Sequence, residues 1–364
     1  FSRTSWIGDE YVYLTLANEM HWNLSNYTTA AHSEISAWPV SIYSQPLFHQ
    51  PPLLPLILKA GLAFNQPRIA ALLFANAAMG LLFIHLLVCW RRLKVEYCWQ
   101  VLGLLSAAFA PLLLFSTTRI HTDATAGIFI ACGIISYIEC LERNSYKWAI
   151  WSATLFVIAL NLRYTSLICL PILVLGHLYY AAGRSCAEGV ANKSGSFTGG
   201  HGKQWRILVI FLIAIGTLGL QHYYRIFFTY HTILPSGFMQ QDTSAPFIKW
   251  TETRTRSRNI VNFSLLIPLL FVLIKPGALR VILRGLYRRD WGAFLVLGSV
   301  YLICCLLVLS YHELRYFAAA TPLFYCCLAW VVSNDKARPF YSLLALFSLF
   351  SMAIVGYREA IIRP

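Results

Sequence analysis

Residues 68–90 read RIAALLFANAAMGLLFIHLLVCW, and Arg91-Arg92-Leu93-Lys94 follows at once. A helix of about 20 mostly apolar residues is long enough to cross the hydrocarbon core of a bilayer. The only charged residue within this stretch is Arg68, at its start. Basic residues that closely follow such a stretch are typical of the cytoplasmic end of a membrane helix. The stretch therefore predicts a membrane-spanning helix that ends in the cytoplasm.

The rest of the chain repeats this pattern. Of its 364 residues, 58% are hydrophobic and only 12% are charged, about half the charge of an ordinary soluble domain. This composition excludes a soluble globule, a disordered tail and a coiled coil. We therefore predict an all-α polytopic membrane protein with about ten transmembrane helices. The predicted spans are 68–90, 99–118, 124–141, 148–162, 165–182, 205–224, 259–275, 292–311, 316–333 and 340–356.

The net charge of +14 arises from 29 basic and 15 acidic residues. The basic residues form short clusters between apolar runs, which favours a role in topology and lipid-headgroup contact over nucleic-acid binding. We place the clusters at 91–94 and 280–289 in the cytoplasm. Residues 1–67 then form an extracytoplasmic first loop with interfacial helices, one of them over 11–22. Residues 68–356 form the helical bundle, with a flexible, Gly- and Ser-rich cytoplasmic loop near 183–204, and 357–364 form a short extracytoplasmic tail.

The ten cysteines show no metal-ligand spacing with histidine. Nearly all lie within or beside apolar runs, so we interpret them as small residues that fill the core. We expect no disulfides.

Two candidate sites lie in the first loop. Asp9 and Glu10 stand at the head of a predicted helix, where adjacent side chains do not share one face. Acidic residues are also favoured there simply by the helix dipole. His49 precedes Pro51-Pro52, a pair that ends an extended segment and permits a helix to begin just afterwards. His49 is then held at the membrane surface near the acids, although a plain loop-to-helix turn explains the same residues.

Three more candidates lie at predicted outer helix ends. Arg119, His121 and Asp123 share a five-residue turn at the bilayer edge, where ionisable groups are costly and suggest function. A surface pair between Arg119 and Asp123 is the simpler alternative. Arg163 interrupts a long apolar stretch, and Arg315-Tyr316 follows a short turn. Either arginine suits a bidentate grip on phosphate, and either could instead reach the lipid headgroups by snorkelling.

The order of these motifs resembles one family. The motifs are Asp9-Glu10-x-x-Tyr13, Pro51-Pro52-Leu53, Asp123, Leu162-Arg163-Tyr164 and Arg315-Tyr316 with Pro322 six residues later. Together, over roughly Gly8 to Tyr325, they resemble the GT-C membrane glycosyltransferases of the protein O-mannosyltransferase and aminoarabinose-transferase type.

The resemblance implies a polyprenyl-phosphate sugar donor and an inverting transfer on the extracytoplasmic side. It implies that Asp9 is the catalytic acid residue of the first loop and Asp123 the Asp of the second loop. Arg163 and Arg315 fall at positions for the donor phosphate. The chain departs from the family because the helix that normally precedes the Asp-Glu loop is absent, which is consistent with a truncated start. The soluble C-terminal domain of some relatives is absent too.

We therefore expect a glycosyltransferase that moves a sugar from a polyprenyl-phosphate carrier to a hydroxyl of a lipid, glycan or protein acceptor. Such a reaction needs a base for the acceptor and cations for the departing phosphate. The catalytic candidates are Asp9, Glu10 and Asp123. The candidates for binding donor or substrate are His49, Arg119, His121, Arg163, Arg315 and Tyr316.

No cofactor is required by these motifs; clustered acids are compatible with a divalent cation, but no metal-ligand spacing demands one. The expected partners are the donor, the acceptor and membrane lipids, without nucleic acid. A multi-pass protein of the bacterial cytoplasmic membrane is favoured, or of the endoplasmic reticulum in a eukaryote. The alternatives are a polytopic transporter, for which we find no internal repeat, and a catalytically inactive GT-C-like subunit.

Overall fold

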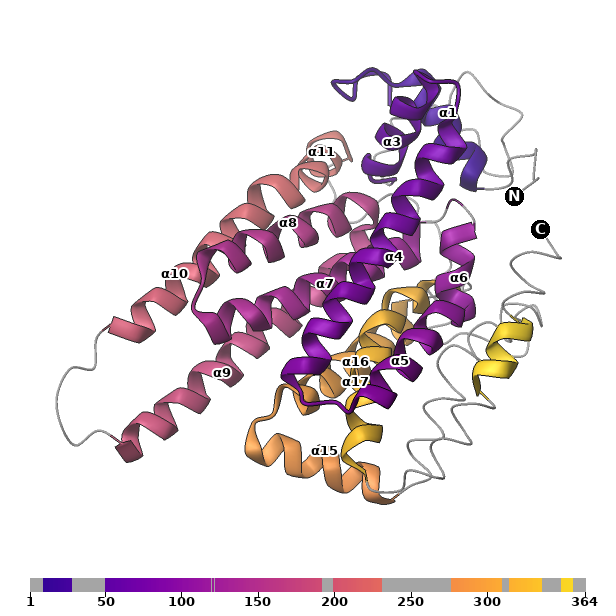
Figure 1. Ribbon diagram of the computed structural model, residues 1–364. Helices are drawn as coiled ribbons and strands as arrows, with labels where there is room; N and C mark the ends of the chain where they lie inside the picture. The colour runs from indigo at the N-terminus through magenta and orange to yellow at the C-terminus, as the bar shows by residue number, and fades with distance from the viewer. Residues whose placement is uncertain are drawn as a thin grey trace.

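The computed structural model describes residues 9–27, 50–118, 120, 122–191, 199–230, 276–309, 314–335 and 348–355. These residues are almost entirely helical and contain no strand, which confirms the predicted all-α class. Figure 1 shows the arrangement of the helices. The α-helices are α1 (Asp9–Glu19), α3 (Leu53–Leu62), α4 (Pro67–Arg92), α5 (Tyr97–Phe109), α6 (Pro111–Thr118), α7 (Thr122–Arg143), α8 (Tyr146–Leu162), α9 (Leu170–Ala191), α10 (Gly199–Ala214), α11 (Gln221–Tyr230), α15 (Pro276–Arg288), α16 (Trp291–Leu309) and α17 (Thr321–Asn334). Three short elements join them: the 3₁₀ helices η2 (Tyr164–Cys169) and η5 (Leu314–Ala319), and the π-helical turn η3 (Ile215–Gly219).

Two of the described helices are long and apolar enough to cross a membrane. They are α4, with 26 residues, and α7, with 22. Several other apolar helices are shorter than a full span, among them α5, α8 and α17. By length and composition the described helices thus support two membrane spans, and the other spans of the predicted ten stay a prediction.

Several predicted spans are interrupted. The stretch 99–118 divides at Ala110 into α5 and α6, because Pro111 has no N–H to continue the hydrogen-bond ladder of α5. The stretch 205–224 contains the turn η3, and 165–182 begins as the 3₁₀ helix η2. The predicted span 259–275 lies outside the described residues, as does most of 340–356.

Helices cover more of the predicted flexible loop near 183–204 than expected. Helix α9 continues to Ala191, and α10 already begins at Gly199. Extending an existing helix is far easier than nucleating one. Helix α9 therefore continues through the glycines that follow its apolar part. Only 192–198 of the loop lies outside the described residues.

Helix α7 lies at the centre of the bundle. Every residue from Thr122 to Leu141 is buried, and a helix buried on all sides must be surrounded by other helices. Small residues permit close packing with α8. A Cβ on Gly133 would lie 2.5 Å from the ring of Phe156, and Ser152 Oγ donates a hydrogen bond to the carbonyl of Gly133 at 2.8 Å. Six of the cysteines are buried in the helices, as expected for core fillers, and no disulfide occurs among the described residues.

The helices bring distant parts of the chain together at two opposite ends of the bundle (Figure 1). At one end Arg92, the last residue of α4, pairs with Glu139 near the end of α7, and Trp291 Nε1 donates to Glu142 at 2.7 Å. We call this the basic end, and it comprises residues 91–96, 142–147, 276–290 and 333–335. The opposite end, called here the α1 end, comprises α1, α3, the start of α7 and the end of α8.

Candidate functional site

Helix α1 packs over the turn that starts α7. The carboxylate of Glu10 is buried, and its Oε1 accepts a hydrogen bond from the backbone N–H of Ile120 at 3.2 Å. One turn along the same face, the hydroxyl of Tyr13 donates to Gln50 Oε1 at 3.0 Å and lies 3.3 Å from Thr122 Oγ1. These contacts fasten the first described helix to Ile120 and Thr122, close to Asp123.

Asp123 and Arg163 form a buried ion pair. Arg163 Nε lies 2.8 Å from Asp123 Oδ1, and each side chain is only 6% exposed. Asp123 is the second residue of α7, where the helix dipole favours a negative charge. Leaving two opposite charges so far from water is costly unless they stay together. The pair therefore ties the start of α7 to the end of α8.

The position of Arg163 results from a break in the chain after α8. Its backbone is extended (φ −152°, ψ 122°) and is followed by the 3₁₀ helix η2. The N–H of Arg163 still completes α8 by bonding to the carbonyl of Ala159 at 2.9 Å, and Ser166 Oγ donates to the same carbonyl at 3.1 Å. The break turns the chain at the residue that carries the charge, so Arg163 faces α7.

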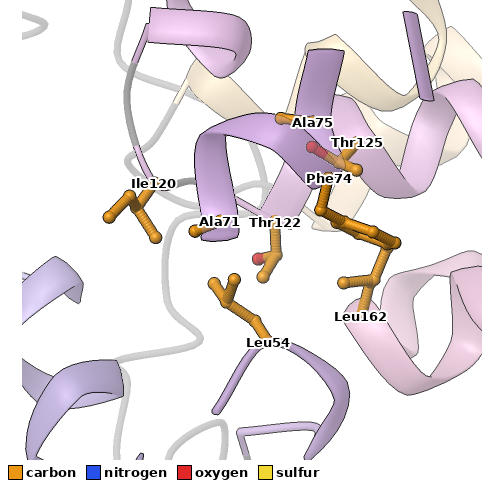
Figure 2. A pocket seen from close by; sticks show the side chains of 8 residues that line it. All are labelled: Leu54, Ala71, Phe74, Ala75, Ile120, Thr122, Thr125 and Leu162. Atoms are coloured by element: carbon orange, nitrogen blue, oxygen red, sulfur yellow. The ribbon is translucent and has the colours of Figure 1, made fainter. Parts of the chain in front are cut away.

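A hollow opens beside this ion pair, and Figure 2 shows the side chains that line it. It is small, with about 10 Å³ of space between α3, α4, α7 and the end of α8, which is room for about one water molecule. Most of its wall is apolar, and two hydroxyl groups, those of Thr122 and Thr125, supply polarity. The lining residues are Leu54, Ala71, Phe74, Ala75, Ile120, Thr122, Thr125 and Leu162. Ligand pockets typically measure roughly 300–1,000 Å³, so the hollow by itself is too small to hold a sugar or a lipid.

The short helix η5, which carries Arg315 and Tyr316, packs against α7 close to the ion pair. A Cβ on Gly127 would lie 2.5 Å from the Cα of Ala319 and 2.8 Å from the carbonyl oxygen of Ala318. Only glycine allows two backbones to approach this closely. Because Gly127 stands one helical turn after Asp123, the η5 backbone passes α7 close to Asp123.

The structure unites some of the predicted site residues. It places Glu10 in α1, Asp123 in α7 and Arg163 directly after α8, and these three segments meet at the α1 end. Asp9 is the first residue of α1, and Arg315 and Tyr316 lie in η5; only the backbone is described for these three. His49, Arg119 and His121 lie outside the described residues.

Asp123 has a partner that sequence proximity did not suggest. The structure pairs it with Arg163 at the end of another helix, while the suggested pair with Arg119 lies outside the described residues. The contacts of Tyr13 with Gln50 and Thr122 were not predicted either. Tyr13 belongs to the Asp-Glu-x-x-Tyr motif, but a hydroxyl partner more than a hundred residues away leaves no signal in a single sequence.

The arrangement offers acidic groups and a guanidinium beside a mostly apolar hollow. Such a site can orient a hydroxyl and balance negative charge. Within the described ranges, no three His, Cys, Asp or Glu side chains gather closely enough to hold a metal ion. Comparison with protein-family models, with curated proteins and with solved structures found no match.

Proposed function

We propose that this chain is a polytopic membrane glycosyltransferase that transfers a sugar from a polyprenyl-phosphate donor to an acceptor hydroxyl. The observation that carries the proposal is the meeting of Glu10, Asp123 and Arg163 beside the apolar hollow at the α1 end. The order of motifs that resembles the GT-C glycosyltransferases points to the same residues. An apolar carrier with a phosphate head needs apolar and charged groups close together, and the α1 end offers both.

The contacts divide the roles among the charged residues. Glu10 already accepts the Ile120 N–H, and Arg163 already holds Asp123. We therefore assign Glu10 and Arg163 to positioning and Asp123 to orienting the acceptor or the carrier. Asp9, the first residue of α1, takes the role of general base for the acceptor hydroxyl, since the helix dipole keeps an acid ionised there.

The departing phosphate needs a cation that is not already occupied in holding a carboxylate. Arg315 stands in η5, whose backbone passes α7 beside the Asp123 turn. A permanently charged, forked guanidinium can take two phosphate oxygens at once, which a lysine cannot. We therefore assign the donor phosphate to Arg315, with Tyr316 beside it.

Turnover of variants tests these roles. With a radiolabelled polyprenyl-phosphate sugar, Asp9→Asn in purified protein should lower turnover by roughly 100-fold or more while donor binding persists. Glu10→Gln, the adjacent matched change, should lower turnover less. If Asp9→Asn retains near-normal turnover, Asp9 is not the base.

The proposal includes about ten spans with the α1 end outside the cytoplasm. Single cysteines at Ser33, Ser194 and Ser244, in a background without reactive native cysteines, test the orientation in intact cells. An impermeant thiol reagent should label positions 33 and 244 but not 194. Labelling of position 194 alone contradicts the orientation.

A further inference from the structure

The faces of α15 are unusual for a helix at the edge of a bundle. Ala278 and Gly285 are buried on one side, and a Cβ on Gly285 would lie 2.8 Å from the ring of Trp330 and 2.9 Å from Ala293. This face packs against α16 and α17. The remaining sides of the helix point away from these neighbours.

The outward sides carry two parallel rows of side chains. The apolar row is Leu279, Leu283 and Tyr287, which are 59%, 57% and 90% exposed. The arginine row is Arg280, Arg284 and Arg288, all exposed. Residues four apart lie about 6 Å from one another along a helix, and successive residues differ by about 100° around its axis. The arginine row thus runs beside the apolar row, and the two rows are roughly a quarter turn apart around the helix axis.

The arginine row is not neutralised by the protein that the structure describes. None of its three guanidinium groups forms an ion pair with a described residue. Two acidic residues lie at the ends of α15. Asp290 follows the helix, and Asp335 lies against Gly277 at its start, on the side of the helix that carries the arginine row. Among the described residues the three positive charges thus stay exposed in one line, which favours a negatively charged partner outside the bundle.

The position of α15 identifies that partner. Trp291, which begins the next helix, donates to Glu142, and Glu142 pairs with Arg92. The end of α15 is therefore level with the ends of α4 and α7, the two helices long enough to span a bilayer. Figure 1 shows α15 lying across the basic end of the bundle. If α4 and α7 span the membrane, α15 lies at the depth of the lipid headgroups.

We propose that α15 is an interfacial helix whose arginine row binds the headgroups of anionic phospholipids, while its apolar row enters the hydrocarbon. Helices that combine an apolar row with a strongly basic row lie in the membrane interface in this way. The inference rests on the membrane location in the proposed function but not on the transfer reaction. It assigns to the run 280–289 a specific lipid contact in addition to its role in topology.

Lipid binding by the purified full chain in neutral detergent tests the inference. The probes are fluorescent phosphatidylglycerol and phosphatidylcholine with the same acyl chains. Each basic side chain near an anionic surface strengthens binding roughly five-fold. Changing the whole arginine row to Gln should therefore weaken phosphatidylglycerol binding by at least about ten-fold and leave phosphatidylcholine unchanged. Millimolar inorganic phosphate should not displace the lipid, since free phosphate lacks the acyl chains that the apolar row contacts.

The matched control removes three exposed basic residues at the same end of the bundle, Arg91, Lys94 and Lys147, also as Gln. This control should retain the preference for phosphatidylglycerol. If the full arginine-row variant does not fold, Arg284→Gln alone should weaken binding roughly five-fold.

Three results contradict the inference: an arginine-row variant that binds phosphatidylglycerol normally, an equal loss in the control, or displacement of the lipid by phosphate. Lipid binding without sugar transfer overturns the proposed reaction but leaves this inference intact. If the purified chain is monodisperse in buffer without detergent, the protein is not in a membrane, and this result contradicts both the membrane location and the inference.

Discussion

Replacement of Arg163 by alanine is the sharpest test of the buried ion pair between Asp123 and Arg163. The change leaves Asp123 as a carboxylate that is only 6% exposed and has lost its ion-pair partner at 2.8 Å. Removing one member of a buried ion pair typically costs about 3–5 kcal/mol. In a chain of this size each kcal/mol lowers the unfolding midpoint by roughly 2 °C, so we expect a drop of roughly 6–10 °C. Thermal unfolding of the purified protein in detergent, followed by circular dichroism, measures it.

A double-mutant cycle and a matched control make this test specific. Because Asp123→Ala in the Arg163→Ala background also removes the carboxylate that Arg163 held, the double variant should lose less than the sum of the single losses, with a coupling of roughly 0.5–3 kcal/mol. Arg143→Ala is the control, since that arginine also pairs with a glutamate but is 57% exposed. Its midpoint should change little, as is usual for exposed pairs. Equal shifts for Arg163→Ala and Arg143→Ala, or losses that simply add, refute the argument.

Three further changes test separate contacts. Glu139→Gln removes the carboxylate that holds both Arg92 and Arg143. The unfolding midpoint should therefore fall further than in the Arg143→Ala variant. Equal midpoints in the two variants argue against a role of Glu139 in holding both arginines. Gly127→Ala forces apart the backbones of α7 and η5, so both the unfolding midpoint and the affinity for the donor should fall. An unchanged donor affinity contradicts our placement of the phosphate site. Tyr13→Phe removes hydroxyl contacts worth about 1 kcal/mol each, so limited proteolysis should cleave near α1 sooner; unchanged cleavage shows that these contacts do not hold the helix.

Local sequence signals predicted the elements that have strong local causes. The apolar run 68–90 corresponds to α4, and α3 begins directly after Pro51-Pro52 as expected. Helix α8 ends at Leu162, next to the charged residue that interrupts the apolar stretch. In each case a continuous apolar run, a proline pair or a charge determines the boundary within a few residues.

Contacts between distant residues could not be predicted from the same signals. Asp123 and Arg163 are separated by a complete helical hairpin, and the nearer Arg119 was the more obvious partner. Counting apolar residues also hid the break at Pro111, because the residues on both of its sides are equally apolar. The Gly- and Ser-rich composition of 183–204 suggested a loop, although continuing α9 to Ala191 requires no new nucleus.

Transfer of a radiolabelled sugar from a polyprenyl-phosphate donor by the purified chain tests the proposed function most directly. The donor, the detergent-solubilised protein and a mixture of lipid, glycan and protein acceptors are incubated, and label is measured in the products after the carrier is removed. We predict donor-dependent labelling of an acceptor by the native chain, and its loss in Asp9→Asn protein that unfolds at the native midpoint. Labelling that is equal in the native and Asp9→Asn proteins, or no labelling with any polyprenyl-phosphate sugar and protein, lipid or glycan acceptor, contradicts the proposal.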